Sequence, residues 1–101
     1  MKIKSSQKGN DLSLKVLEKR IDSGNSAQLK AEFLVLLENN VTNIEVDLSE
    51  VQSCDSSGLS ALLMLQRHIV QAEGSITLLN CHENILKLIK ITKLDRVFDF
   101  K

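Results

Sequence analysis

The feature that most constrains this chain is the stretch Cys54-Asp55-Ser56-Ser57-Gly58-Leu59. It follows an alternating run at residues 44–48 that is typical of a β-strand, and it opens the longest helical pattern in the sequence. Two adjacent hydroxyls therefore lie where a strand gives way to a helix. The first N–H groups of a helix are unpaired and carry partial positive charge, so they favour a capping side chain and tolerate an anion. We expect the function at this junction.

Length and charge set the broad class of protein. The 101 residues predict a single domain spanning 1–101, and 13 basic against 13 acidic residues give no net charge. Neutral net charge and 3% aromatic residues argue against a nucleic-acid binder, which would show a basic face or aromatic side chains for stacking. No apolar run approaches the roughly 20 residues of a membrane span. We expect a cytoplasmic protein that binds neither nucleic acid nor membrane.

The two cysteines do not form a metal or redox motif. Cys54 and Cys81 belong to no CxxC pair, so no zinc site is predicted. They are expected to be reduced thiols that pack as small apolar side chains at strand ends. We therefore predict no metal and no other cofactor.

The first part of the chain predicts a hairpin. A strand at about residues 2–7 is followed by the turn Gly9-Asn10-Asp11 and by alternation that begins at Leu12 and continues to about Ile21. Leu17 breaks the alternation, through either a bulge or a change of burial at the end of the sheet.

The rest of the chain alternates helices and strands. In order, the pattern predicts a helix at about 27–38 capped by Ser26 or Asn25, a strand at 41–51, a helix at 57–73 ended by Gly74, a strand at 76–79, a helix from 82 or 83 to 92, and a last short strand near 94–100. The order β-β-α-β-α-β-α-β indicates an α/β domain with a mixed central sheet and helices packed against it. The right-handed crossover rule places the linking helices on a common face.

A projection of the long helix at about 100° per residue separates a core face from an exposed face. The predicted core face contains Leu59, Ala61, Leu62, Leu63, Leu65, Ile69, Val70 and Ala72. The predicted exposed face contains Ser60, Met64, Arg67 and Gln71. Ser56 falls at the N-terminal end of the exposed face.

Three stretches make the chain resemble a STAS domain, the fold of bacterial anti-sigma factor antagonists. They are Leu17-Glu18-Lys19-Arg20-Ile21-Asp22, the run from Asp47-Leu48-Ser49 to Asp55-Ser56-Ser57-Gly58-Leu59, and Ile91-Thr92-Lys93-Leu94-Asp95-Arg96-Val97-Phe98. Together they cover nearly the whole chain and imply the STAS fold. Members of the family often have glycine where this chain has Lys19.

The resemblance implies a non-enzymatic regulator. In the family, the first serine of the Asp-Ser-(Ser/Thr)-Gly-Leu motif, here Ser56, is phosphorylated by a partner that is both anti-sigma factor and serine kinase. The unphosphorylated form binds this partner and releases the sigma factor, and a metal-dependent serine phosphatase resets the switch. Asp22 matches an acidic position beside the same surface. We expect a monomer when the protein is free.

Other residues of the junction have two interpretations each. Asp55 is expected mainly as a helix cap, and it also lies where it could orient the Ser56 hydroxyl. Ser57 is expected as a cap in preference to a second phosphorylation site, and Gly58 permits either close approach by another backbone or a tight helix start. Met64 is either a partner contact or an ordinary exposed methionine. The predicted partner surface comprises Asp22, Asp55, Ser57, Gly58, Leu59, Ser60 and Met64.

Two alternatives compete with this interpretation. A serine hydrolase would need a base beside Ser56, yet the chain has no G-x-S-x-G elbow, and His68 lies about three turns down the same helix. His68 and His82 are therefore expected in surface or capping roles. The second alternative keeps the fold: a non-enzymatic STAS subunit with a structural or docking role in a transport or signalling complex. The intact Ser56-Ser57 pair favours the phosphorylation switch.

Overall fold

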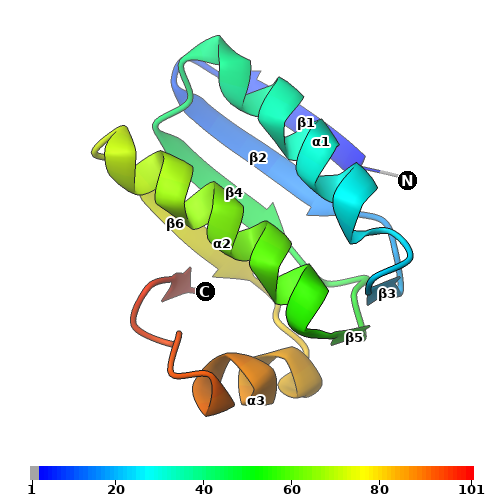
Figure 1. Cartoon of the computed structure of the whole chain (residues 1–101). Helices are drawn as coiled ribbons and strands as arrows, with labels where there is room; N and C mark the ends of the chain where they lie inside the picture. The colour runs from blue at the N-terminus through cyan, green and yellow to red at the C-terminus, as the bar shows by residue number, and fades with distance from the viewer. Residues whose placement is uncertain (1–2) are drawn as a thin grey trace.

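The central sheet consists of an antiparallel hairpin extended by parallel strands. The computed structural model describes residues 3–101, so Lys2, where the predicted first strand begins, lies outside the described residues. β1 (Ile3–Lys8) and β2 (Asp11–Val16) pair antiparallel. β4 (Asn43–Asp47), β6 (Ser75–Leu79) and β7 (Asp99–Phe100) follow in the order β1-β2-β4-β6-β7, parallel to β2 (Figure 1). The predicted hairpin and mixed sheet are confirmed.

A second, two-stranded sheet corrects two strand predictions. β3 (Arg20–Ile21) pairs parallel with β5 (Ser53–Cys54), apart from the main sheet. The sequence predicted one strand from Leu12 to Ile21, which is interrupted after Val16, and one at 41–51, which is shorter and ends at Asp47. The chain leaves the main sheet after Val16, which explains why the alternation fails at Leu17, and it turns again where the N–H of Val51 donates to Leu48.

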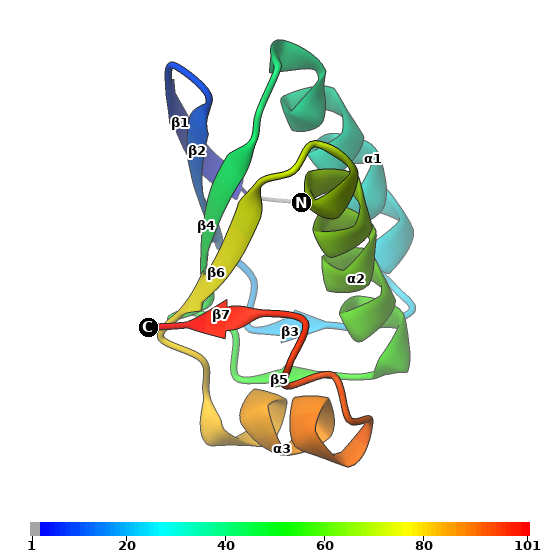
Figure 2. The same ribbon diagram turned by 90° about the vertical axis from the view of Figure 1, so that its left-hand side faces the viewer.

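The helices cover one face of the sheet and one end of it. α1 (Ser26–Leu36), extended by the 3₁₀ turn η1 (Leu37–Asn39), and α2 (Ser56–Gln71) lie side by side on the same face (Figures 1 and 2). α3 (Glu83–Ile91) instead lies at the end of the sheet, below β3 and β5. The prediction of a common helical face therefore holds for α1 and α2 and is wrong for α3.

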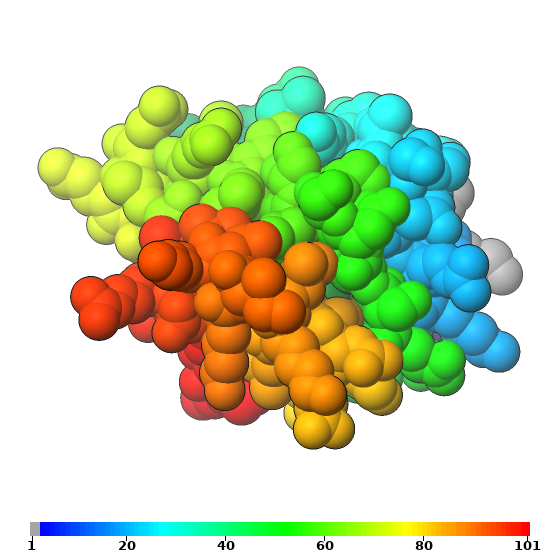
Figure 3. All heavy atoms as spheres, turned by 60° about the horizontal axis from the view of Figure 1, so that its bottom comes forward, coloured from blue at the N-terminus to red at the C-terminus, as the bar shows by residue number. Residues whose placement is uncertain are grey.

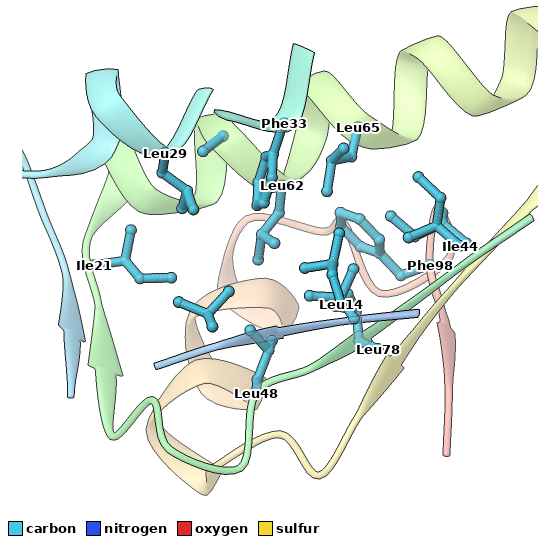
Figure 4. Close-up of a cluster of buried hydrophobic side chains, with 14 of the residues drawn as sticks. Leu14, Ile21, Leu29, Phe33, Ile44, Leu48, Leu62, Leu65, Leu78 and Phe98 are labelled. Atoms are coloured by element: carbon cyan, nitrogen blue, oxygen red, sulfur yellow. The ribbon is translucent and has the colours of Figure 1, made fainter. Parts of the chain in front are cut away.

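The core lies between the main sheet and the two long helices. Figure 4 shows side chains of β2, β4 and β6 meeting those of α1 and α2. Leu14, Ile44 and Leu78 point up from the strands, and Phe33 and Leu62 point down from the helices, all of them buried. Burial of each such side chain contributes about 1.5–3 kcal/mol. This layer fixes where the N-terminus of α2 lies.

The second face of the sheet is polar and open. Ser13 and Glu45 are paired across β2 and β4 and are both exposed. Within residues 3–101, Figure 2 shows no element over this face. The open face explains why Glu45 and Asp47 alternate with buried residues along a central parallel strand, which would be apolar on both sides if helices covered both faces.

The buried face of α2 is rotated toward α1 compared with the face that the helical projection predicted. Leu59, Leu62, Leu65 and Ile69 are buried as predicted, but Val70 is 57% exposed. Ala72, also predicted in the core, is exposed, and Leu63 is half-buried. On the opposite flank Met64, predicted as exposed, is half-buried and packs against the core. Met64 is buried because α1 covers that flank of α2, and Val70 is exposed because no helix of residues 3–101 covers the other flank.

Candidate functional site

The small sheet holds the segment that leads into α2. Ile21 pairs with Cys54, and the carbonyl of Ile21 accepts a hydrogen bond from the backbone N–H of Asp55 at 3.2 Å. The carbonyl of Lys19 accepts from the N–H of Gln52 at 2.8 Å. Lys19 is not among the positive-φ residues of the described chain, so the backbone at this position does not require glycine.

Asp55 is the N-cap of α2. Its Oδ1 accepts hydrogen bonds from the backbone N–H groups of Ser57 at 2.9 Å and Gly58 at 3.1 Å. The hydroxyl of Ser57 donates to the same oxygen. This bond from Ser57, with help from the two backbone amides, holds the pKa of the Asp55 carboxyl below its ordinary value. The predicted capping role of Asp55 is confirmed, whereas Ser57 is not the cap but a donor to it.

The two hydroxyls of the junction have different surroundings. Ser56 is the first residue of α2 and is exposed. Ser57 is half-buried, and its hydroxyl is engaged by Asp55. An incoming group can therefore approach Ser56 without breaking the cap of the helix, whereas modification of Ser57 would disrupt it.

Gly58 permits a close backbone approach, which decides between its two interpretations. A Cβ atom at this position would lie 2.8 Å from the carbonyl oxygen of Ile21 and 2.9 Å from the Sγ of Cys54. Leu59 follows directly and is only 4% exposed. The expectation that Leu59 contacts a partner is thus corrected: its side chain anchors the helix in the core, and Gly58 is buried beside it.

Asp22 lies beside the same junction. A hollow of about 340 Å³ is lined by Arg20, Asp22, Ser53, Cys54 and Asp55. The carboxylate of Asp22 accepts from the N–H of Gly24 at 2.9 Å, and its carbonyl accepts from the N–H of Ser26 at 2.8 Å, so Asp22 also shapes the turn into α1. Figure 3 shows the green segment around residues 50–60 reaching the surface between α3 in orange and the blue-to-cyan segment that leads into α1.

Ser60 and Met64 lie in a groove between α1 and α2, not on a free helical face. The Nζ of Lys30 donates to the Oγ of Ser60 at 3.0 Å. A hollow of about 320 Å³ is lined by Lys30, Ser60, Met64, Arg67, His68 and Gln71. Sequence reasoning missed Lys30 and Arg20, because their places depend on how distant elements pack and no local pattern encodes that.

The cysteines and histidines have structural surroundings. Cys54 and Cys81 are both half-buried free thiols. Burial, with the charge of Asp55 as a second cause, raises the pKa of Cys54 to about 11, and burial raises the pKa of Cys81 to about 11. The Nδ1 of His82 accepts from the N–H of Asn84 at 3.1 Å and caps α3, which confirms a predicted capping role.

Two features are absent from residues 3–101. No helix there combines the length and the apolar character needed to span a bilayer. No group of three or more His, Cys, Asp or Glu side chains is arranged there to hold a metal ion.

Solved structures share this fold at low sequence identity. An anti-sigma factor antagonist (STAS) domain protein of Planctomyces limnophilus matches with a TM-score of 0.87 and 17% identity, over 97% of this chain and 87% of that one. A Thermotoga maritima protein assigned as an anti-sigma factor antagonist matches with a TM-score of 0.81 and 20% identity, over 97% and 84%. Phosphorylated SpoIIAA, a cell fate determinant of Bacillus, matches with a TM-score of 0.74 and 18% identity, over 99% and 91%.

These structural matches show the fold of the chain. The family to which it belongs is shown by a match to a sequence family. The family described as "Mlab, STAS domain" matches residues 3–99. The fold expected from the three sequence stretches is confirmed. This chain belongs to the STAS domain family.

Proposed function

We propose that this protein is an anti-sigma factor antagonist that works by partner switching. In its unphosphorylated form it binds an anti-sigma factor that is also a serine kinase, and phosphorylation of Ser56 releases that partner. A metal-dependent serine phosphatase then restores the binding form. The observation that carries the proposal is the exposure of Ser56 at the start of α2 while the neighbouring Ser57 hydroxyl is bonded to Asp55.

Phosphorylation at this position is expected to leave the fold intact. A phosphoserine carries about 1.5–2 negative charges at neutral pH. The partial positive charge at the N-terminus of α2 favours such an anion by about 0.3–1 kcal/mol. The modification therefore acts on the partner and not on the stability of this domain.

The same charge would weaken an interface that covers the junction. Asp22 and Asp55 already place two carboxylates around the hollow next to Ser56. A dianion added there must be desolvated when an apolar or acidic partner surface covers it, which costs several kcal/mol of binding free energy. Each 1.4 kcal/mol is tenfold in affinity, so two such steps suffice to separate the complex.

Mass spectrometry tests the assignment of the phosphorylated residue. A pull-down from the native organism first supplies the kinase. The wild type and a Ser57→Ala variant, incubated with that kinase and ATP, are each expected to gain one phosphate, whereas Ser56→Ala gains none. Phosphate on Ser56→Ala would sink the assignment. Ser57→Ala is the matched control because it removes the adjacent hydroxyl.

Binding measurements test the consequence of the charge. Ser56→Asp is expected to weaken kinase binding by at least about tenfold. Its melting temperature is expected to stay close to that of the wild type, because the helix N-terminus accommodates the carboxylate. A large drop in melting temperature would mean that Ser56 has mainly a structural role.

A second candidate function is a non-enzymatic docking subunit of a transport or signalling complex. It is favoured by a structural match to part of murine Slc26a9, an anion transporter, with a TM-score of 0.71 and 17% identity over 85% of this chain and 14% of that one. The pull-down separates the two candidates. Recovery of transporter subunits, in amounts that Ser56→Asp does not change, would support the docking role, whereas a serine kinase lost from the Ser56→Asp sample supports the switch.

A further inference from the structure

The groove between α1 and α2 concentrates positive charge. Its lining side chains are Lys30, Ser60, Met64, Arg67, His68 and Gln71. Among these described residues there are two cations and a histidine but no carboxylate, although the whole chain has equal numbers of basic and acidic residues. The groove is thus a local excess of positive charge and of hydrogen-bond donors on a neutral protein.

Lys30 holds its charge in place without neutralising it. Its Nζ donates to the neutral hydroxyl of Ser60 at 3.0 Å, a bond that bridges the two helices and is partly buried. The bond positions the ammonium at the wall of the groove, and the remaining N–H donors of the ammonium stay available for an acceptor. An anionic group seated in the groove would find this cation already ordered.

Exposed apolar side chains lie beside the charge. Leu34 is 50% exposed and lies four residues after Lys30, so the two occupy the same side of α1. Met64 is half-buried on the facing helix and lines the groove. α1 is apolar on several sides, including the exposed Leu34 and Val35, although only its inner side faces the core. Such a helix is typical of a position that is covered on a second side.

We infer that this groove, the α1–α2 groove, binds an acidic amphipathic segment of a partner protein. Apolar side chains of that segment pack on Leu34 and Met64, and its carboxylates pair with Lys30 and Arg67. Charge complementarity selects the occupant, because a basic or purely apolar segment would leave the Lys30 ammonium unpaired in a covered site.

The inference rests on the proposed function in one respect, the link to phosphorylation. Ser56 lies four residues before Ser60 and therefore on the same side of α2. A phosphate on Ser56 would add negative charge one helical turn from the acidic segment. Repulsion between the two would release the partner.

Selection of peptides on this chain alone tests the inference. A displayed library of random peptides of about 16 residues, roughly four helical turns, is selected on the wild-type protein. Enriched sequences are expected to place Asp or Glu beside Leu, Ile or Phe at helical spacing. The best peptide and a version with Asn and Gln in place of its acids are then compared by calorimetry, and the loss of the acids is expected to cost at least about tenfold in affinity.

Protein variants locate the binding site. The double variant Lys30→Glu with Arg67→Glu is expected to bind the selected peptide at least tenfold more weakly than the wild type. Leu34→Ser should also lower the affinity for the peptide measurably. Lys87→Glu with Lys90→Glu on α3, which reverses two exposed charges elsewhere, is the matched control and should not change the affinity. Circular dichroism confirms that each variant is folded, and Lys30→Gln replaces Lys30→Glu if the reversal unfolds the protein.

Several results would overturn the inference. They are a selection that enriches no peptide, enriched peptides without acidic residues, and an affinity that the charge reversal leaves unchanged. Full competition by inorganic phosphate together with indifference to Leu34→Ser would show a site for small anions in place of a protein segment. The selection uses no kinase, so its failure leaves the phosphorylation of Ser56 to its own test.

Discussion

A methyl group on Gly58 would come within 2.8 Å of the carbonyl oxygen of Ile21. The same oxygen accepts the hydrogen bond from the N–H of Asp55, so one atom of β3 fixes both the residue that caps α2 and the first turn of the helix. The position of Ser56, between these two contacts in the chain, follows from the small sheet that β3 forms with β5.

Gly58→Ala is therefore expected to destabilise the protein. Alanine favours a helix over glycine by about 1 kcal/mol, but overpacking against a backbone atom costs about 1–3 kcal/mol. The clash with Ile21 is expected to prevail, because Cys54 closes the other side of the site. Urea unfolding should show a lower midpoint. Gly24→Ala, whose added Cβ meets only the tip of the Asp22 side chain at 3.1 Å, is the control and should cost less. A raised midpoint for Gly58→Ala would contradict the geometry.

Features that depend on neighbours in sequence could be predicted from the sequence. The alternation of Leu12, Leu14 and Val16 predicted a strand, and Asp55 before a helical pattern predicted a cap; the structure confirms both. Each depends on backbone periodicity or on hydrogen bonds that span two or three residues. The projection of the long helix also predicted that Ser56 is exposed, and the structure confirms it. The bond from the Ser57 hydroxyl to Asp55 could not be predicted, because it depends on the side-chain rotamer of Ser57.

Features that depend on packing between distant elements could not be predicted. The burial of Met64 and the exposure of Val70 follow from α1 lying on only one flank of α2. The break between β2 and β3 follows from the pairing of Ile21 with Cys54, which are far apart in sequence. The position of Lys30 beside α2 could not be predicted for the same reason, since its hydrogen-bond partner Ser60 belongs to the other helix.

Two adjacent residues at the end of α2 have different structural roles, so substitutions at them should change the stability of the protein in opposite directions. Glu73 has a left-handed backbone with φ 59°, and the N–H of Gly74 donates to Ile69 at 2.9 Å, as in a helix-terminating motif. Because a side chain in this conformation is strained by about 1–2 kcal/mol, Glu73→Gly should stabilise the protein by up to about 1 kcal/mol.

Gly74→Ala should instead destabilise the protein severely, by about 3 kcal/mol or more. A Cβ atom on Gly74 would lie 1.5 Å from the carbonyl oxygen of Thr42, so the segments that lead into β4 and β6 would have to separate. Urea unfolding of both variants checks the pair. Urea midpoints that shift equally and in the same direction for both variants would show that Glu73 and Gly74 do not have different structural roles.

The two thiols are expected to react slowly. Burial, followed by the charge of Asp55, raises the pKa of Cys54 to about 11 from an ordinary 9.0, and burial raises that of Cys81 equally. Two pKa units reduce the thiolate fraction at pH 8 about a hundredfold, and only the thiolate reacts. Iodoacetamide should therefore label the folded protein about a hundredfold more slowly than the urea-unfolded protein. Mass spectrometry that finds either cysteine labelled at the unfolded rate would refute this.

Asp55→Asn should change how stability depends on pH. The hydroxyl of Ser57 and then the backbone amides hold the pKa of Asp55 below its ordinary value in the folded protein. A lowered folded-state pKa means that the carboxylate adds stability above the unfolded-state pKa of about 3.9, and that this stability is lost as the pH falls through the folded-state value. Asparagine still accepts the capping bonds but does not titrate.

The stability difference between wild type and Asp55→Asn is therefore expected to be largest above about pH 5 and to shrink below about pH 4. Urea midpoints measured across this range test it. Ser56→Ala is the matched control, because it changes the same helix end without removing a titratable group, and its difference from wild type should not vary with pH. A constant difference for Asp55→Asn would show that Asp55 caps α2 by hydrogen-bond geometry alone, and that its charge contributes nothing to holding Ser56 in place.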